Sequence, residues 1–70
     1  MPLTMMQAGR PTVICKIGGR EDTRQFLESL GFTIGGEVSI VSEMAGNVIV
    51  NVKNTRVAIS KEMASRILVA

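Results

Sequence analysis

Apolar and polar side chains alternate with a period of two along several short stretches of the chain. Such alternation is typical of β-strands that bury one face. In chain order, the predicted strands are Thr12–Ile17, Glu37–Glu43, Asn47–Lys53, Arg56–Ile59 and Ile67–Val69.

The alternation also predicts which side chains face the core. Strict alternation in the first strand turns Val13, Cys15 and Ile17 inward, so we expect Cys15 to be a buried residue with an inert thiol. In the later strands the inward positions are Val38, Ile40, Val48, Val50, Val52, Val57 and Ile59. By the same rule Ile14, Ile49 and Leu68 fall on the opposite face.

Short connections separate the strands and indicate a β-meander. Ala45-Gly46 is the expected tight turn between the second and third strands, and Asn54-Thr55 is the expected two-residue connection to the fourth. Ser60 is placed to cap a short helical turn over Lys61–Ser65.

A helix is predicted over Asp22–Leu30. Asp22, with Gln25 three residues later, resembles a capping box at the start of the helix. Gly31 supplies the residue that most easily ends a helix in a left-handed conformation. The expected core-facing stripe consists of Thr23, Phe26, Leu27 and Leu30.

These elements predict a mainly β fold, a small SH3-like β-barrel of about five strands with one short α-helix and a short C-terminal helical turn. A chain of 70 residues has room for a single domain, residues 1–70. We expect the last strand to pair with the first, because a small open sheet would otherwise expose its edges. Any edge left open allows self-association with another copy of the chain.

Composition narrows the possible chemistry. The chain has no histidine, which is the commonest general base and a common metal ligand, and its only cysteine is Cys15. The carboxylates have no spacing typical of a zinc or calcium site. We therefore predict no catalytic residue, no cofactor and no metal site, and a protein that is not an enzyme.

The charge pattern does not favour nucleic acid as a partner. The net charge is only +2, and the eight basic residues are dispersed among six acidic ones. The aromatic residues are two phenylalanines near the predicted helix, and no stretch approaches the length of a membrane span. We expect a cytoplasmic protein that binds no nucleic acid.

A protein-binding surface remains as the functional hypothesis. The helix exit Leu30-Gly31-Phe32 is apolar and turns sharply, and exposed apolar residues with a polar rim usually mark a partner site. By periodicity, Arg24 and Glu28 are exposed on the adjacent helix. The predicted partner-binding residues are thus Arg24, Glu28, Leu30, Gly31 and Phe32.

The chain resembles the FeoA family of the bacterial ferrous iron uptake system along nearly its whole length. The resemblance begins with an N-terminal lead-in ending at Gly9, the strand Val13–Ile17 and Gly18-Gly19. It continues through Leu30-Gly31-Phe32 with Gly35 and Val38-Ser39-Ile40-Val41. The later motifs are Gly46-Asn47-Val48-Ile49-Val50, Val57-Ala58-Ile59 and Met63-Ala64 with Ile67 and Val69.

The resemblance implies an SH3-like barrel that acts beside FeoB, a membrane ferrous iron transporter with a cytosolic GTP-hydrolysing domain. A FeoA-like chain would bind this transporter and modulate its nucleotide-driven transport, meeting the inner face of the membrane only through that partner. The alternative is a sensor or regulatory domain that associates with an iron-dependent transcriptional repressor, because some such repressors carry a similar barrel.

Overall fold

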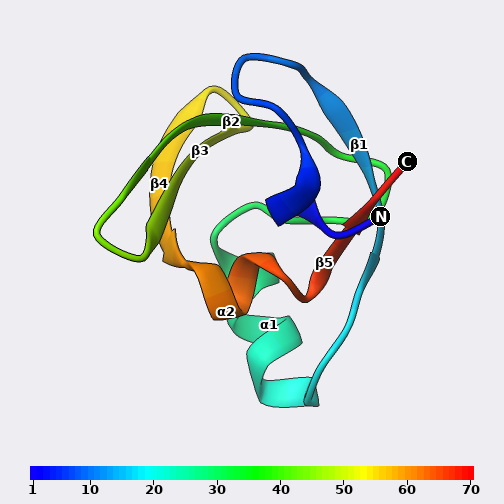
Figure 1. Ribbon diagram of the computed structural model, residues 1–70. Helices are drawn as coiled ribbons and strands as arrows, with labels where there is room; N and C mark the ends of the chain where they lie inside the picture. The colour runs from blue at the N-terminus through cyan, green and yellow to red at the C-terminus, as the bar shows by residue number, and fades with distance from the viewer.

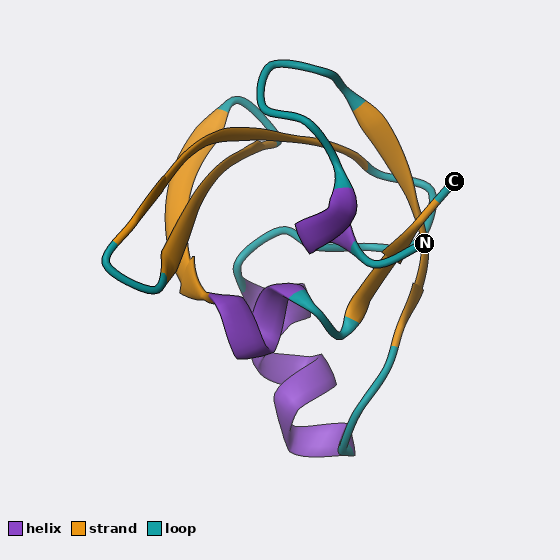
Figure 2. Ribbon diagram, in the orientation of Figure 1, coloured by secondary structure: helices purple, strands orange, loops and turns teal.

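The computed structural model describes residues 1–70 and contains all five predicted strands (Figures 1 and 2). Their bounds agree with the predicted ones to within about one residue at each end. The strands are β1 Thr12–Ile17, β2 Glu37–Met44, β3 Asn47–Val52, β4 Thr55–Ser60 and β5 Ile67–Val69. The helices are η1 Leu3–Met5, a single 3-10 turn, α1 Glu21–Ser29 and α2 Lys61–Ala64.

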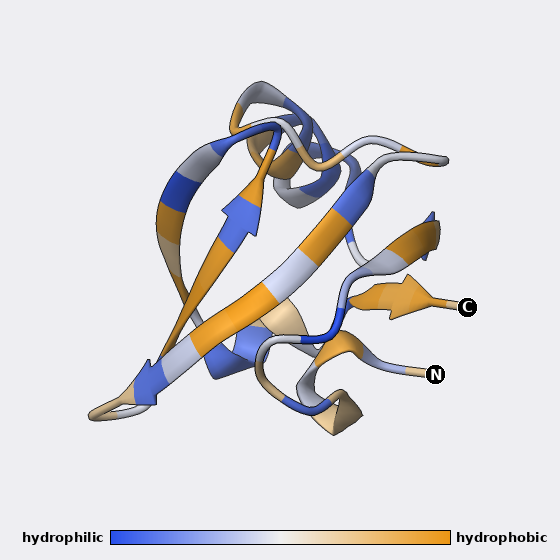
Figure 3. Ribbon diagram, turned by 90° about the horizontal axis from the view of Figure 1, so that it is seen from above, coloured by the Kyte–Doolittle hydropathy of each residue, from blue (hydrophilic) through white to orange (hydrophobic).

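The five strands form one antiparallel sheet in the order β4-β3-β2-β1-β5, which curls around the core (Figure 1). The C-terminal strand β5 pairs with β1, with Ile67 opposite Ile17 and Val69 opposite Ile14. This confirms the expected return of the last strand to the first. The mainly β fold is confirmed, with the two ends of the chain side by side (Figure 3).

The β1 strand contains an irregularity that corrects its predicted faces. Its register against β5 shifts between Ile14 and Lys16, which leaves Cys15 as an extra residue in the ladder. Such a bulge reverses the alternation of side chains beyond it. Consequently Ile14 and Ile17, three residues apart, are both buried, whereas Val13 and Cys15 are exposed. The prediction of a buried Cys15 was wrong because strict alternation cannot anticipate a bulge.

The core contains fourteen buried hydrophobic residues, most of them on the strands. Figure 3 shows hydrophobic and hydrophilic residues alternating along the strands, as expected for strands with one buried face. The inward positions predicted on β2 and β3 are confirmed, and Ile59 on β4 is buried while Val57 is half-buried. Ile49 and Leu68, predicted to face outward, are also half-buried.

Both hairpins turn through two residues in the left-handed region. Ala45 and Gly46 have φ angles of 49° and 83°, and Lys53 and Asn54 have φ angles of 49° and 62°. Two consecutive positive φ angles define the turn that matches the natural twist of a hairpin. The first turn was predicted correctly. The second was predicted one residue too late, because Thr55 pairs with Val52 and therefore belongs to β4.

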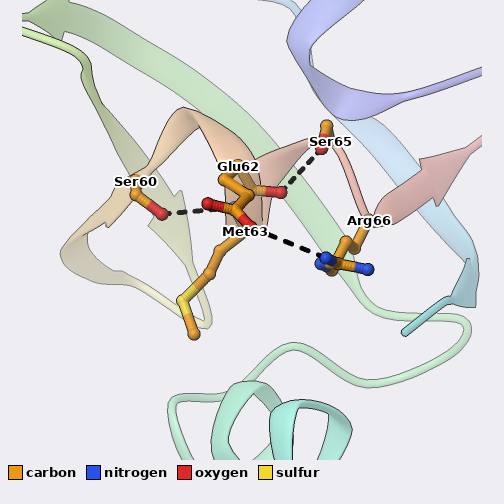
Figure 4. Close-up of polar contacts among 5 residues, drawn as sticks. All are labelled: Ser60, Glu62, Met63, Ser65 and Arg66. Carbon is orange, nitrogen blue, oxygen red and sulfur yellow. Dashed lines mark hydrogen bonds and ion pairs between the residues drawn. The ribbon is translucent and has the colours of Figure 1, made fainter. Parts of the chain in front are cut away.

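The short helix α2 joins β4 to β5 and is capped as predicted by Ser60. The Met63 backbone N–H donates to Ser60 Oγ at 3.2 Å, and Ser65 Oγ donates to the Glu62 carbonyl at 2.6 Å (Figure 4). Arg66 Nη2 lies 3.6 Å from Glu62 Oε1. These local contacts hold a four-residue helix that could not be stable in isolation.

The N-terminal segment closes the barrel in a way that periodicity did not reveal. Leu3, in the 3-10 turn η1, has 0% of its surface exposed and belongs to the core. Met1 exchanges backbone hydrogen bonds with Val69, and Pro2 forms a bridge with Leu68. The first residues therefore cover the outer edge of β5 and complete the core.

The Leu3→Ala substitution should lower the free energy of unfolding by about 2–5 kcal/mol, because it leaves a cavity in a small core. Urea denaturation followed by circular dichroism measures this change. Met5→Ala is the matched control, since Met5 belongs to the same turn and is 69% exposed. Equal effects of the two substitutions would contradict the structural role of Leu3.

The exposed Cys15 thiol should react stoichiometrically with a thiol-specific reagent in the native protein, because no unfolding is needed to reach it. The measurement is the colour yield with Ellman's reagent in the absence of denaturant, compared with the yield in guanidinium chloride. Reaction only after denaturation would show that Cys15 is buried as strict alternation implies.

Candidate partner-binding surface

The helix α1 begins one residue before the predicted start and without the predicted cap. Arg20 is the N-cap, and its side chain makes no capping hydrogen bond. Asp22 Oδ1 instead accepts a hydrogen bond from the Thr23 backbone N–H at 2.9 Å. Glu21 and Asp22 both lie in the first turn, where negative charge is favourable against the helix dipole.

Most of the surface of α1 faces away from the barrel. Leu27 is its only fully buried residue, and Thr23 is half-buried. Phe26 was predicted to belong to the core-facing stripe but is 48% exposed. Helical geometry explains why Phe26 is exposed. At 100° per residue it lies well to one side of Leu27, and the helix contacts the barrel only along a narrow line.

The C-terminus of α1 is a complete Schellman motif. Gly31 has φ +107°, its N–H donates to the Glu28 carbonyl at 3.0 Å, and the Phe32 N–H donates to the Leu27 carbonyl at 3.1 Å. Leu27 and Phe32 are both fully buried, which provides the hydrophobic contact that accompanies this motif. The predicted role of Gly31 as helix terminator is confirmed.

The structure divides the five predicted partner-binding residues into three groups. Arg24 and Glu28 are exposed on α1, and neither forms an ion pair. Leu30 and Gly31 are half-buried, and Leu30 packs against the edge of the core. Phe32 has 0% of its surface exposed, so its side chain holds the exit of α1 in place and is not accessible to a partner in this conformation.

Two residues extend this surface beyond the predicted set. Phe26 adds an exposed aromatic side chain to α1, and Lys53 in the β3–β4 turn lies next to Gly31. A Cβ built on Gly31 would lie 3.6 Å from Lys53 Cδ and 3.8 Å from a Val52 methyl carbon. We define the α1 surface as Arg24, Phe26, Glu28, Leu30, Gly31 and Lys53. It has two flanks, because on an α-helix Phe26 lies roughly 200° around the axis from Arg24 and Glu28, on the other side of Leu27. No sequence signal could place Lys53 there, because the contact joins residues more than twenty positions apart.

A shallow hollow of about 280 Å³ adjoins the α1 surface at Lys53. It lies where β2 and β3 meet the β3–β4 turn, and five of its six lining residues are polar. The lining residues are Glu37, Val38, Ser39, Asn51, Lys53 and Asn54. A polar and open hollow of this kind is suited to hydrogen bonds with a partner chain more than to enclosure of a small molecule.

No group of three or more histidine, cysteine, aspartate or glutamate side chains lies close enough together to hold a metal ion. None of the helices has the length and apolar character required to cross a bilayer.

The family model of the FeoA domain matches residues 1–70 of this sequence. The chain belongs to the FeoA domain family. The resemblance inferred from the sequence motifs is thereby confirmed. A relative in Methanocaldococcus jannaschii carries the name Fe(2+) transport protein A. It is 29% identical to this chain over 68 residues, which span 97% of this chain and 83% of the relative.

Solved FeoA structures have the same fold. An iron uptake regulatory protein (FeoA) is 34% identical, with a TM-score of 0.89, over 99% of this chain and 93% of that one. FeoA of Stenotrophomonas maltophilia, described as a prokaryotic SH3 domain protein and solved with zinc, is 25% identical with a TM-score of 0.86, over 100% and 89% of the two chains. The SH3-like architecture predicted from the sequence is therefore confirmed.

The barrel also occurs within a larger regulator. A manganese-dependent transcriptional repressor superposes with a TM-score of 0.90 at 17% identity, over 99% of this chain but only 39% of the repressor. At this level of identity the likeness concerns the fold alone.

Gly31→Ala should lower the free energy of unfolding by about 1–2 kcal/mol, because a residue with a Cβ is strained at this positive φ. Chemical denaturation measures the loss. Gly18→Ala is the matched control, since Gly18 has no positive φ and its added Cβ would make only an ordinary contact with the Arg66 carbonyl at 3.6 Å. A smaller loss for Gly31 than for Gly18 would contradict the capping geometry.

Proposed function

We propose that this FeoA-family chain is a non-enzymatic accessory protein of ferrous iron uptake. It binds the cytosolic GTPase side of a FeoB-type transporter and modulates nucleotide-driven transport. It is located in the cytoplasm and reaches the inner face of the membrane only through this partner. The observation that carries the proposal is the match of the FeoA domain model to residues 1–70.

The α1 surface supports the choice of docking site. It combines an aromatic side chain, Phe26, with unpaired charges of both signs, Arg24 and Glu28, on a helix that is largely uncovered by the barrel. Phenylalanine and arginine are both enriched in protein interfaces, and arginine is also among the residues that contribute most of the binding energy. The Gly31 cap fixes the backbone at the end of the helix, so the helix itself need not be ordered on binding.

The decisive experiment is a calorimetric titration of this protein into the cytosolic GTPase domain of a FeoB-type transporter. It is carried out with GDP and with a non-hydrolysable GTP analogue, each with and without ferrous iron. Saturable binding whose affinity depends on the nucleotide supports a coupled modulator, because linkage requires the protein to affect nucleotide affinity by the same factor. Absence of binding to this domain in every condition would contradict docking on the GTPase side, and a repeat with the complete transporter that also shows no binding would contradict the proposal as a whole.

Arg24→Glu should weaken this binding about tenfold or more, whereas Arg10→Glu, which makes the same change of charge away from the α1 surface, should leave it nearly unchanged. Phe26→Ala should act in the same direction through lost apolar contact. Arg24 is exposed and Phe26 is 48% exposed, so both variants should still unfold in one cooperative transition, and this transition serves as the folding control. Equal binding by the Arg24 and Arg10 variants would exclude α1 as the docking site.

A second candidate function is a regulatory domain that associates with an iron-dependent repressor. The repressor barrel described above favours it only at the level of fold. Co-purification of this protein with a DNA-binding regulator, and not with the transporter, would support this alternative.

A further inference from the structure

The two edges of the sheet differ in how they are protected. The edge strand β5 is three residues long, and Met1 and Pro2 cover it through the hydrogen bonds to Val69 and the bridge to Leu68. The other edge strand, β4, is six residues long, contains no proline and pairs with β3 without a bulge. Of the features with which proteins usually protect an edge, β4 has only a charged side chain, Arg56.

The pairing of β4 with β3 leaves a row of backbone groups facing outward. Val52 and Thr55 flank the two-residue turn and form a hydrogen-bonded pair, so alternation makes Val57 and Ile59 the next residues that bond to β3. The N–H and C=O groups of Arg56 and Ala58 therefore point away from the sheet. None of the backbone hydrogen bonds outside the regular elements involves these groups, and both residues are exposed.

The net charge of the protein is concentrated beside this edge. The hairpin of residues 47–60 contains two cations, Lys53 and Arg56, and no acidic residue, whereas the remaining residues contain six cations and six anions. The hairpin thus carries the entire net charge of +2. Neither cation forms an ion pair, although Glu37 lines the hollow beside Lys53. A binding strand would therefore meet the positive charge of Arg56 on the open edge, with Lys53 in the adjoining turn.

We infer that the β4 edge binds an extended acidic segment of another protein by strand addition. The outward groups of Arg56 and Ala58 supply the backbone hydrogen bonds, the Arg56 side chain favours carboxylates, and Lys53 in the adjoining turn adds positive charge nearby. A second copy of this chain fits less well, because pairing two β4 edges would bring two hairpins of charge +2 together. This edge adjoins the α1 surface at Lys53 but presents different groups, the backbone of Arg56 and Ala58, and the inference does not depend on the identity of the transporter.

The test uses a short blocked peptide in which valine and glutamate alternate, titrated into the isotope-labelled protein and followed by amide NMR. We expect saturable shifts centred on β4, together with slower hydrogen exchange at the Arg56 and Ala58 amides. A peptide with lysine in place of each glutamate should produce no comparable shifts. Absence of shifts at β4 with the acidic peptide at millimolar concentration, or equal binding of the lysine peptide, would overturn the inference.

Two variants separate charge from backbone pairing. Arg56→Glu should weaken peptide binding roughly three- to tenfold, while Arg10→Glu should not. Ala58→Pro removes an outward N–H that takes no part in the β3 ladder, so it should reduce binding with the sheet intact. Binding unaffected by both edge variants would overturn the inference. Concentration-dependent dimerisation that Arg56→Glu strengthens and Ala58→Pro abolishes would assign the edge to a second copy instead, which also overturns it.

Discussion

The pairing of β5 with β1 is the constraint on which the rest of the structure depends. It joins strands separated by some fifty residues and brings Ile14, Ile17, Ile67 and Val69 into one core. Closing so long a segment costs conformational entropy, which the burial of these side chains and the backbone hydrogen bonds between the strands offset. The N-terminal residues reinforce the closure, because Leu3 fills the core and Met1 bonds to β5. A small barrel of this kind is therefore stabilised by residues from both ends of its chain.

The helix α1 is attached to this barrel with little burial and strong local geometry. Leu27 and Phe32 anchor it from within, and the hydrogen bonds around Gly31 define the angle at which the chain leaves it. The exposed face of the helix is consequently available to bind a partner, while Leu27 and Phe32 stabilise the attachment of the helix to the barrel. Phe32 illustrates the division: it adjoins the proposed docking residues in sequence, yet its side chain lies wholly in the core.

The surface chemistry is asymmetric for a protein with so small a net charge. The α1 surface carries mixed charges and an aromatic side chain, whereas the β3–β4 hairpin carries only cations and an open strand edge. These surfaces meet at Lys53, which lies against Gly31 and also lines the polar hollow. A large partner could therefore contact both surfaces at once, and a small chain would contribute a considerable share of its area to such an interface.

The sequence by itself determined the elements that rest on local interactions. Period-two patterns located all five strands. Ser60 indicated the start of α2, and Gly31 indicated the end of α1. These signals are readable because the interactions behind them join residues only a few positions apart. The tertiary structure alone decided which side chains are accessible. A bulge in β1 exposed Cys15 and buried Ile14, distant packing placed Leu3 in the core and Lys53 beside Gly31, and the shallow seating of α1 exposed Phe26. Each of these outcomes depends on contacts between residues far apart in the chain. The periodicity of a single segment cannot predict such contacts, because it reflects only that segment.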